Sequence, residues 1–355
     1  MNGRSSLSRF TLHKIKAKNI QQYIRPIAVS SKTKSSPKTN PLVMCDNNDH
    51  YSSLKTEIQV HALSSSDILP QPWLGLSPPS YEKAISATSL AISQEEDNPF
   101  TRAEYRPFLL DPDVASSDWV SKLELSTVME MVRNEVLNTR EERLKVLVLY
   151  GSLRARSYSR LLAYEAARIL FRLGCDVRVY NPTGLPVKDD LEQNHPKVQE
   201  LRRLSIWSNG HIWVSPEQHG NLTAVFKNQI DWIPLSTGSI RPTQGRTLAI
   251  AQINGGSQSF NSVNSLRILG RWMRMFTITN QSSIPNGYTQ FTSDNSEAGG
   301  SRLIPSSNRD RLVDCMEEFV KYTIVMRKHA DLFADRFSER EERAAAMKED
   351  KQDKF

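Results

Sequence analysis

The sequence predicts a doubly wound α/β domain over residues 144–335, and three observations lead to this prediction. From Leu144 onward, short apolar stretches rich in β-branched residues alternate with longer stretches whose apolar residues recur at helical spacing. The short stretches have the length of strands, and several of them end in a polar or glycine-bearing loop. Strands that alternate with helices in this way form a parallel sheet covered by helices on both faces.

The elements of this domain follow one another in strict alternation. The first strand, 144–150, is an apolar run broken only by Lys145, and the helix after it, 159–172, carries apolar residues three and four positions apart. The other expected strands are 176–180, 211–214, 247–253 and 275–279, and the other expected helices are 198–208, 222–232, 261–274 and 309–332. Five strands and five helices are therefore expected, with the strands parallel.

The segments that flank this domain have a different composition. Residues 1–100 form a basic and then Ser/Pro-rich extension that keeps no long apolar period, so we expect it to be poorly ordered. Residues 101–143 are expected to dock on the domain through one helix, because six apolar residues recur there at helical spacing: Leu123, Leu125, Val128, Met129, Val132 and Val136. Residues 336–355 form a charged tail.

The formal charge of +7 belongs to one end of the chain. The 46 lysines and arginines outnumber the 39 acidic residues, but nine of the basic residues and no acidic residue lie in 1–45. Taking these nine away leaves residues 46–355 with 37 basic against 39 acidic residues, a net charge of −2. A domain that binds nucleic acid needs a basic excess of its own, so specific nucleic-acid binding is disfavoured.

Cysteine usage and the basic segment both bear on where the protein is located. Cys45, Cys175 and Cys315 are few and widely spaced, which suits a reducing compartment such as the cytoplasm. Residues 12–27 are basic, free of acidic residues and amphipathic, as a mitochondrial transit peptide is, although we favour a solvated basic tail. No apolar run is long enough to cross a bilayer. We expect a cytoplasmic protein, with mitochondrial import as the alternative.

The loop 151–159 (GSLRARSYS) follows the first strand and opens the first helix. A parallel α/β sheet binds its ligand outside the carboxyl ends of the strands, which is where this loop falls. It offers three serine hydroxyls and two guanidinium groups beside a helix N-terminus, whose free N–H groups and dipole favour an anion. We predict a site for one monophosphate. The simpler interpretation, a helix cap by Ser157 or Ser159, needs only one hydroxyl.

Two further polar loops follow the third and fourth strands. Residues 215–223 (SPEQHGNLT) form a proline-bearing turn, and residues 254–261 (NGGSQSFN) carry paired glycines. Such turns bring backbone N–H and C=O groups against the edge of a flat heterocycle, and Ser and Gln side chains add donors and acceptors. A plain strand–helix turn would explain the glycines of the second loop but not Gln258.

Other common sites do not match the sequence. No two glycines stand at G-x-G spacing, no Gly-Lys-Ser/Thr is present, and no G-x-S-x-G is present, which disfavours a dinucleotide fingerprint, a P-loop and a serine hydrolase. His211 and His219 come without a third metal ligand, so no metal site is expected.

One phosphate loop and two ring-facing loops on a five-stranded parallel sheet describe a site for FMN. Residues 105–343 also resemble the ArsH family of NADPH-dependent FMN reductases, which is associated with arsenical resistance and has a flavodoxin-like fold. The resemblance rests on GSLRARSYSR (151–160), HPKVQELRRLSIWSNG (195–210), SPEQHGNLTAVFKNQIDWIPLSTG (215–238), RPTQGRTLA (241–249), NGGSQSFNSVNSLRILGRWMRM (254–275) and NQSS (280–283). It implies bound FMN, NADPH as the co-substrate and a homotetramer.

The resemblance also implies which residues bind FMN. The phosphate would be held by Ser152, Arg154, Ser157 and Ser159. The isoalloxazine would be lined by Ser215, Pro216, Glu217, Gln218, His219 and Gly220, and its polar rim completed by Gly255, Gly256, Ser257 and Gln258. Hydride transfer needs no side-chain acid or base, so no catalytic residue is nominated. The sequence departs from the family where Gln218 replaces an Arg, and extra Ser, Gly and Asn in 286–308 are expected to reshape the loop after the fifth strand.

The expected function is therefore transfer of hydride from NADPH through bound FMN to an acceptor. The family implies oxygen, a quinone, an azo dye, free flavin or a trivalent organoarsenical. The alternative is a flavin-bound electron carrier or redox sensor without NADPH turnover. Arg241 and Arg246 are candidate partners of the NADPH 2′-phosphate, although ordinary loop arginines are the simpler interpretation. A second subunit could cover the large apolar side chains of Trp232, Ile233 and 272–275, and burial within one chain is equally plausible.

Overall fold

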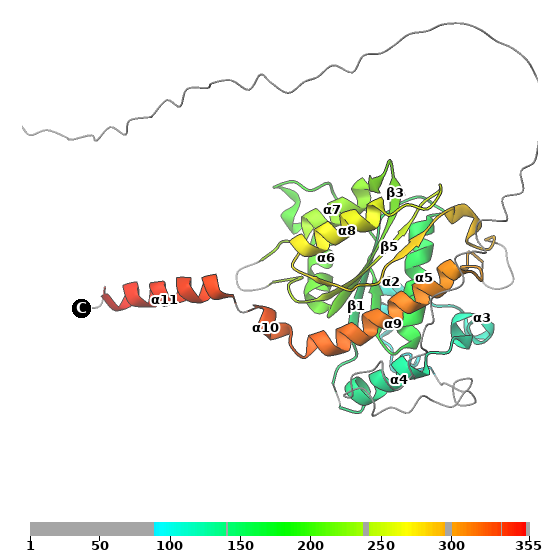
Figure 1. Ribbon diagram of the computed structural model, residues 1–355, viewed down its shortest axis with the longest axis horizontal. Coiled ribbons are helices and arrows are strands. Elements are labelled where there is room, and N and C mark those ends of the chain that lie inside the picture. Colours follow the sequence, from blue (N-terminus) through cyan, green and yellow to red (C-terminus); the bar gives the residue numbers. More distant parts are fainter. Residues whose placement is uncertain (1–88, 140, 237–240, 295–299, 335, 353–355) are drawn as a thin grey trace, which may run out of the picture. The chain divides into compact units, whose positions relative to one another are not determined.

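The computed structural model describes residues 89–352, apart from residues 140, 237–240, 295–299 and 335. The predictions for residues 1–88, including the transit-peptide hypothesis and most of the poorly ordered extension, lie outside the described residues. The described part of the chain is an α/β structure in which a central sheet lies between two layers of helices (Figure 1).

Parallel pairing builds the centre of the sheet. Its strands are β1 (Lys145–Tyr150), β2 (Asp176–Val179), β3 (Gly210–Gln218), β5 (Thr247–Ile253), β6 (Phe276–Thr277) and β7 (Ser282–Ile284). They lie in the order β2-β1-β3-β5-β6, with β7 also paired to β5, and all of these pairings are parallel. Val148 of β1 is in register with Val179 of β2 on one side and Ile212 of β3 on the other. The predicted parallel sheet is therefore confirmed, and its strand order reverses between β1 and β3.

Alternate side chains of each strand enter two separate cores. Val146 and Val148 of β1 face one core, while Leu147 and Leu149 face the other. The first core is covered by α5 (Tyr158–Arg172) and α9 (Ser307–Arg327), and the second by α6 (Pro196–Trp207), α7 (Ala224–Trp232) and α8 (Asn261–Trp272) (Figure 1). Because both faces are covered, the central strands are apolar on both sides, and this is the pattern that predicted them.

The segment before β1 packs on the face that α5 and α9 cover. It contains α2 (Pro99–Tyr105), α3 (Pro112–Ser117), the 3₁₀ turn η2 (Val120–Lys122), α4 (Ser126–Val132) and the π turn η3 (Arg133–Leu137). Val128, Met129, Val132 and Val136 are buried in the first core, as the helical spacing predicted. The segment thus has more helices than the one expected, and the domain boundaries around it stay a prediction.

A buried arginine ties this segment to the amino end of β2. The Arg106 side chain forms an ion pair with Asp97 and a second with Asp176, at 2.6 Å, and its Nε donates to the carbonyl of Val177. Removing either carboxylate would leave the buried Arg106 guanidinium with only one of its two anionic partners, and this would lower the stability of the fold.

The expected fifth strand is divided into β6 and β7. Between them, the Arg267 guanidinium donates to the carbonyls of Ile278 and Thr279, and Glu318 accepts hydrogen bonds from the Thr279 hydroxyl and the Asn280 amide. The Ile278 amide still donates to the Leu248 carbonyl of β5, but beyond it these polar side chains take the backbone hydrogen bonds, so regular pairing stops and resumes at Ser282.

The remaining elements are short or lie near the carboxyl end of the chain. They are η4 (Glu192–Asn194), β4 (Asn221–Leu222), η5 (Gly287–Thr289), α10 (Ala330–Ala334) and α11 (Phe337–Gln352). None of the helices in the described ranges is long and apolar enough to cross a membrane.

Candidate functional site

A cleft of about 800 Å³ opens at the carboxyl ends of β1, β3 and β5. The loop after β1 supplies one wall, residues 216–218 of β3 supply a second, and residues 253–255 and 287–288 close the rest. Ligands of doubly wound sheets bind at this edge, beside the point where the strand order reverses. The cleft is therefore the candidate functional site, and all three sequence-predicted loops contribute to it.

Two buried hydroxyls lie at the amino end of α5. The Oγ of Ser157 caps the helix by accepting from the Arg160 amide, and it lies 3.2 Å from the Oγ of Ser159. Both serines are buried yet line the cleft, as Ser152 does. The capping interpretation is thus correct for Ser157, and it leaves Ser152 and Ser159 without a capping role.

The two arginines of this loop have different environments. Arg156 donates to the carbonyl of Thr292 at 2.9 Å and forms an ion pair with Asp294, so its charge is already compensated. The exposed side chain of Arg154 makes no hydrogen bond or ion pair with any residue that the structure describes. Arg154 is therefore the cation of this wall that stays free for an anionic ligand.

Close backbone approach brings the first loop against the second. A Cβ atom on Gly151 would lie 2.9 Å from both Pro216 Cδ and Thr223 Oγ1, so only glycine fits without a shift. The Thr223 hydroxyl donates to the Gly151 carbonyl at 2.6 Å and also caps α7. Gly151 and Thr223 thereby fix the spacing between the phosphate loop and the carboxyl end of β3.

The second loop is a continuation of β3 into a tight hairpin. Pro216, Glu217 and Gln218 line the cleft, and His219 and Gly220 form the two-residue turn to β4 with φ values of 52° and 72°. His219 pairs with the side chain of Gln218 at the exposed tip. Neither turn residue lines the cleft, and Ser215 is buried with its hydroxyl donating to the Pro216 carbonyl.

The Glu217 carboxylate is occupied by the protein itself. It accepts from the Ser259 hydroxyl at 2.7 and 2.8 Å, from Gln252 Nε2 at 3.0 Å and from the Ser262 amide at 3.4 Å. These contacts tie the second loop to the third. Glu217 lines the cleft, but its charge is directed toward the opposite loop.

The third loop contributes through its first two residues. Gly255 lines the cleft, whereas Gly256, Ser257 and Gln258 do not, and Gln258 Nε2 donates instead to the Ser283 hydroxyl at 2.9 Å. Asn254, which was not among the predicted site residues, also lines the cleft. Its Nδ2 donates to the Ser257 carbonyl, while its buried Oδ1 has no partner among the described residues.

Other lining residues could not be identified from the three loops. Gly287 and Tyr288 come from the segment after β7, and a Cβ on Gly287 would lie 2.7 Å from Ile253. Arg156 is one of the two arginines expected at the phosphate and does line the cleft, while Tyr158 of the same loop lines it without having been assigned a role. The one available signal for Gly287 and Tyr288 was the unusual composition of 286–308, which predicted a reshaped loop without saying where it lies.

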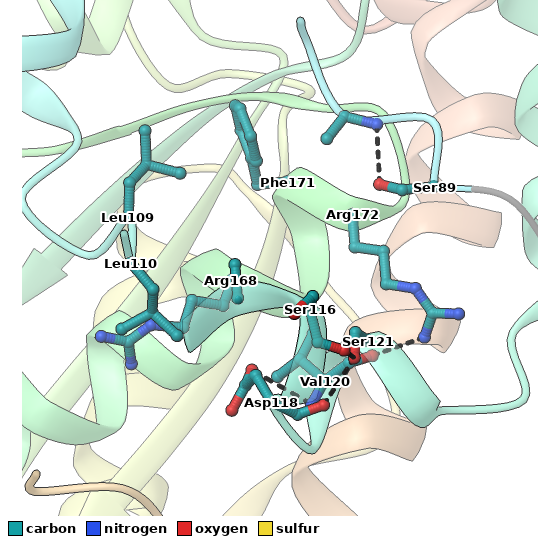
Figure 2. A pocket seen from close by; sticks show the side chains of 12 residues that line it. Ser89, Leu109, Leu110, Ser116, Asp118, Val120, Ser121, Arg168, Phe171 and Arg172 are labelled. Atoms are coloured by element: carbon teal, nitrogen blue, oxygen red, sulfur yellow. Dashed lines mark hydrogen bonds between the residues drawn. The ribbon is translucent and has the colours of Figure 1, made fainter. Parts of the chain in front are cut away.

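Two smaller cavities lie away from the carboxyl ends of the strands. One, of about 430 Å³, lies between α5 and the segment that holds α3 and η2, with Leu109, Leu110 and Phe171 among its lining residues (Figure 2). The other, of about 250 Å³, lies at the amino ends of β3 and β5 beside Arg241 and Arg246. Neither cavity shares the loops of the cleft.

Arg241 and Arg246 face away from the candidate site. Arg246 donates to the carbonyls of Ser208 and Ile206 at 2.7 and 2.8 Å, and Arg241 pairs with Glu339. Burial lowers the pKa of Arg246 to about 10. These contacts at the opposite ends of the strands favour the simpler interpretation of both residues as structural arginines.

Comparisons with known proteins agree with this geometry. The family model described as NADPH-dependent FMN reductase matches residues 144–289. The chain is 59% identical to the NADPH-dependent FMN reductase ArsH of Rhizobium meliloti over 203 residues, which cover 57% of this chain and 82% of the relative. It is 55% identical to the ArsH protein of Acidithiobacillus ferrooxidans, over 57% of this chain and 83% of the relative. It is 54% identical to the ArsH protein of Shigella flexneri, over 55% of this chain and 75% of the relative.

Solved structures are similar at a lower level. The flavoenzyme NAD(P)H:(acceptor) oxidoreductase FerB from Paracoccus denitrificans has a TM-score of 0.39 and 19% identity, over 52% of this chain and 97% of that chain. The sequence identities over most of the length of three relatives are sufficient: the chain belongs to the ArsH family of NADPH-dependent FMN reductases.

Proposed function

We propose that the chain is an NADPH-dependent FMN oxidoreductase of the ArsH type, and that its FMN binds in the cleft at the carboxyl ends of β1, β3 and β5. The observation that carries the placement is the unpaired guanidinium of Arg154 beside the hydroxyls of Ser157 and Ser159 at the amino end of α5. An arginine, buried hydroxyls and a helix N-terminus together suit a phosphate group.

The charge of the first loop supports a single phosphate there. Arg156 is compensated by Asp294, so Arg154 alone of these two arginines keeps an unpaired charge. The α5 helix is 15 residues long, and the cap by Ser157 satisfies the Arg160 amide while leaving the first N–H groups of the helix available. The dianionic phosphate of one FMN would therefore have as partners one free guanidinium, the Ser152 and Ser159 hydroxyls and the N–H groups of the first turn of α5.

The rest of the cleft fits a flat ring system with a polar edge. Its volume of about 800 Å³ lies within the range of small-molecule sites, and Pro216, Val225 and Ile253 give it apolar surface. The buried Oδ1 of Asn254 is an acceptor that no described residue satisfies, so it is suited to an N–H group of the ring. Gly255 leaves space at the edge, because a Cβ there would meet nothing within 4 Å.

Bound FMN would accept a hydride from NADPH and pass the electrons to an acceptor. The chain's own contribution is to bind and orient. Arg154 and the serines hold one end of the cofactor, and Glu217 fixes the distance between the two ring-facing loops through Ser259 and Gln252. We nominate no side-chain acid or base. An electron carrier without NADPH turnover is less well supported, since the related sequences are named as reductases.

Titration of the purified protein with FMN tests this proposal. We expect a yellow complex whose flavin absorbance is bleached by NADPH. The variant Arg154→Met should raise the Kd for FMN about tenfold to a hundredfold, because it removes a charge-assisted hydrogen bond. Its stability without FMN should stay unchanged, since the side chain is exposed and has no described partner.

The matched control is Arg203→Met, which removes an exposed arginine on α6, outside the cleft. It should bind FMN as the wild type does. Wild-type protein that stays colourless and takes up no FMN would overturn the proposed function, and an unchanged Kd for Arg154→Met would overturn the placement of the phosphate.

We also propose that the chain forms a homotetramer. Trp232 and Ile233 are buried within the chain, but Ile268 and Trp272, one helical turn apart on α8, are 59% and 62% exposed. Adjacent large apolar side chains on one surface are typical of a contact between subunits.

For location, we propose the cytoplasm. Cys175 and Cys315 are buried free thiols, as is usual in a reducing compartment. A fluorescent fusion of residues 1–45 should stay diffuse in the cell. Accumulation of that fusion in mitochondria would favour the alternative.

A further inference from the structure

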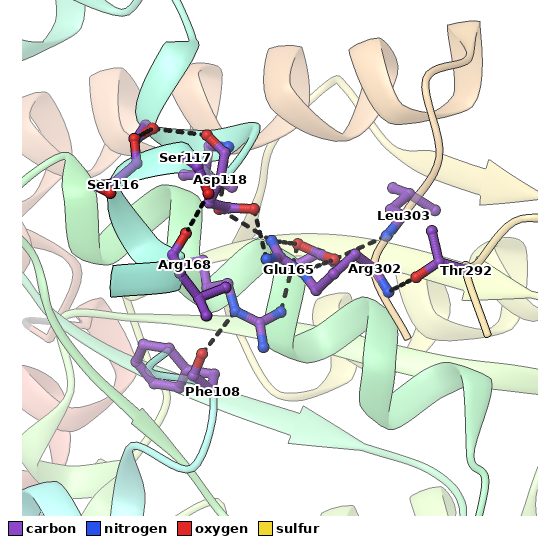
Figure 3. Close-up of polar contacts among 12 residues, drawn as sticks. Phe108, Ser116, Ser117, Asp118, Glu165, Arg168, Thr292, Arg302 and Leu303 are labelled. Atoms are coloured by element: carbon purple, nitrogen blue, oxygen red, sulfur yellow. Dashed lines mark hydrogen bonds and ion pairs between the residues drawn. The ribbon is translucent and has the colours of Figure 1, made fainter. Parts of the chain in front are cut away.

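Four charged side chains, of which Glu165 and Arg302 are buried, join three distant parts of the chain. The Arg302 guanidinium makes paired contacts with Glu165 of α5, both at 2.8 Å, and paired contacts with Asp118, at 2.5 and 3.1 Å (Figure 3). Arg168 completes the group by an ion pair with Glu165 and a hydrogen bond to the Phe108 carbonyl. Two cations and two carboxylates balance, and the buried charges of Arg302 and Glu165 require such partners.

Arg302 lies on one of two antiparallel arms that follow β7. The arms, 290–294 and 300–304, pair through the Thr292 amide with the Arg302 carbonyl and through the Ile304 amide with the Gln290 carbonyl. The Arg302 amide also donates to the Thr292 hydroxyl, and the Leu303 amide donates to Glu165. The position of both arms therefore depends on the charges of Glu165 and Asp118.

The same arms support the phosphate side of the cleft. The carbonyl of Thr292 accepts from Arg156, Asp294 forms the ion pair with Arg156, and the Phe291 ring stacks on the Tyr158 ring at 5.9 Å. Arg156 and Tyr158 line the cleft. An unbroken series of contacts thus runs from Asp118, through Arg302 and the arms, to the wall that would hold the phosphate.

Apolar packing is incomplete where Asp118 attaches. The cavity of about 430 Å³ lies beside Asp118 and Arg168, between α5 and the segment that holds α3 and η2 (Figure 2). Where an interface contains a cavity, the side chains that line it make fewer van der Waals contacts, so apolar packing stabilises that part of the interface less. The segment is attached here largely by polar contacts, which are the ion pair of Asp118 with Arg302 and the hydrogen bonds from Arg172 to the carbonyls of Val120 and Leu123. Burial lowers the pKa of Arg302, but the hydrogen bonds and charges of Glu165 and Asp118 outweigh it, so the pKa is raised and the cation is retained.

We propose that Asp118 and Arg302 are positioning residues of the cofactor cleft, so that the segment before β1 helps to set the affinity for FMN. This inference rests on the proposed function. Neither residue touches the cleft. They hold the two arms in place, and the arms hold Arg156 and Tyr158 at the wall.

The variant Asp118→Asn tests the proposal, because it keeps the shape of the side chain and removes one charge. We expect the Kd for FMN, measured by quenching of flavin fluorescence, to rise about tenfold. Amide hydrogen exchange in 290–294 and 300–304 should become faster even without FMN. The matched control is Asp97→Asn, which weakens a similar buried ion pair with Arg106 at the amino end of β2. It should lower stability and leave the Kd within about twofold of the wild type.

A double-mutant cycle identifies the route of the effect. If Asp118 acts through the arms, Asp118→Asn and Arg156→Gln should be non-additive in FMN binding. Should Asp118→Asn fail to fold, Arg302→Lys provides the same test, since it keeps the charge but loses the fork that spans both carboxylates. An unchanged Kd in the folded variant, an equal loss in Asp97→Asn, or additive effects in the cycle would overturn the inference. Failure of the wild type to bind FMN would instead overturn the proposed function.

Discussion

His211 is a buried imidazole near the start of β3, and its environment keeps it neutral. The Trp213 indole donates to its Nδ1 at 3.2 Å, and its Nε2 has no partner among the described residues. Burial, together with the charge of Arg246, lowers the pKa of His211 to about 3. In the unfolded chain the imidazole takes up a proton as the pH falls below about 6.5, whereas in the folded chain it does so only near pH 3. The free energy of unfolding therefore decreases as the pH falls from about 6.5 toward 3.

We therefore predict that the free energy of unfolding falls by up to about 1.4 kcal/mol per pH unit below pH 6.5 because of His211 alone. The variant His211→Gln cannot take up the proton and should lose about 2 kcal/mol less than the wild type between pH 6.5 and about pH 4.5. Urea denaturation at both pH values, with saturating FMN, measures this difference. The variant His329→Gln, at an exposed position, should keep the wild-type slope. Equal slopes for His211→Gln and the wild type would contradict the prediction.

For single residues, the sequence was sufficient to predict which residue types form the site, but not which residues they contact. An arginine and serines beside a helix N-terminus indicated an anion site, and Arg154, Ser157 and Ser159 do line the cleft. Glu217 was predicted at the ring, but its carboxylate is held by Ser259, 42 residues later in the chain. Local pattern contains no information about a partner so distant.

At the scale of elements, two kinds of glycine can be separated. Gly255 lines the cleft, and a Cβ there would meet no atom of the protein within 4 Å. Gly255→Val should therefore leave the free energy of unfolding without FMN within about 0.5 kcal/mol of the wild type. The new side chain would occupy ligand space, so the Kd for FMN should rise at least about tenfold. Thermal unfolding without FMN and flavin titration measure the two effects.

Two further glycine variants complete this comparison. Gly256→Val changes the neighbouring glycine, whose Cβ would meet only Asn254 at 3.9 Å, and it should affect neither quantity. Gly210→Ala should cost about 1–3 kcal/mol of stability, because a Cβ there would contact Thr247 and lie 2.7 Å from Phe319. If Gly255→Val bound FMN like the wild type, the third loop would not lie against the cofactor.

The predicted and observed elements differ where long-range polar contacts decide the structure. The central strands are buried on both faces, so their apolar runs were sufficient to predict them. The division of the last strand depends on Arg267 and Glu318, which belong to the helices α8 and α9. The arms after β7 depend on Arg302, which lies 137 residues from Glu165 and 184 residues from Asp118. Periodicity reports the burial of a segment but not such long-range polar contacts.

At the scale of the whole molecule, the excess positive charge and the candidate site lie in different parts of the chain: the charge lies in residues 1–45, and the cleft lies in the α/β domain. The strand order β2-β1-β3-β5-β6 places the cleft beside β1 and β3, in the part of the chain whose net charge is −2 from residue 46 onward. An anionic cofactor is thus attracted by one loop rather than by the field of the whole domain. FMN affinity should accordingly depend weakly on salt and strongly on Arg154.

The exposed face of α8 supports the last prediction, which concerns assembly. Light scattering should give a mass four times the 40.3 kDa of one chain. The variant Trp272→Glu places a charge beside Ile268 on the surface that a second subunit would cover, so it should reduce the mass. The variant Leu191→Glu changes a side chain that is 88% exposed and lies outside this face, and it should keep the wild-type mass. A monomer mass for the wild type would show that the α8 face remains in contact with solvent, and the tetramer would then be excluded.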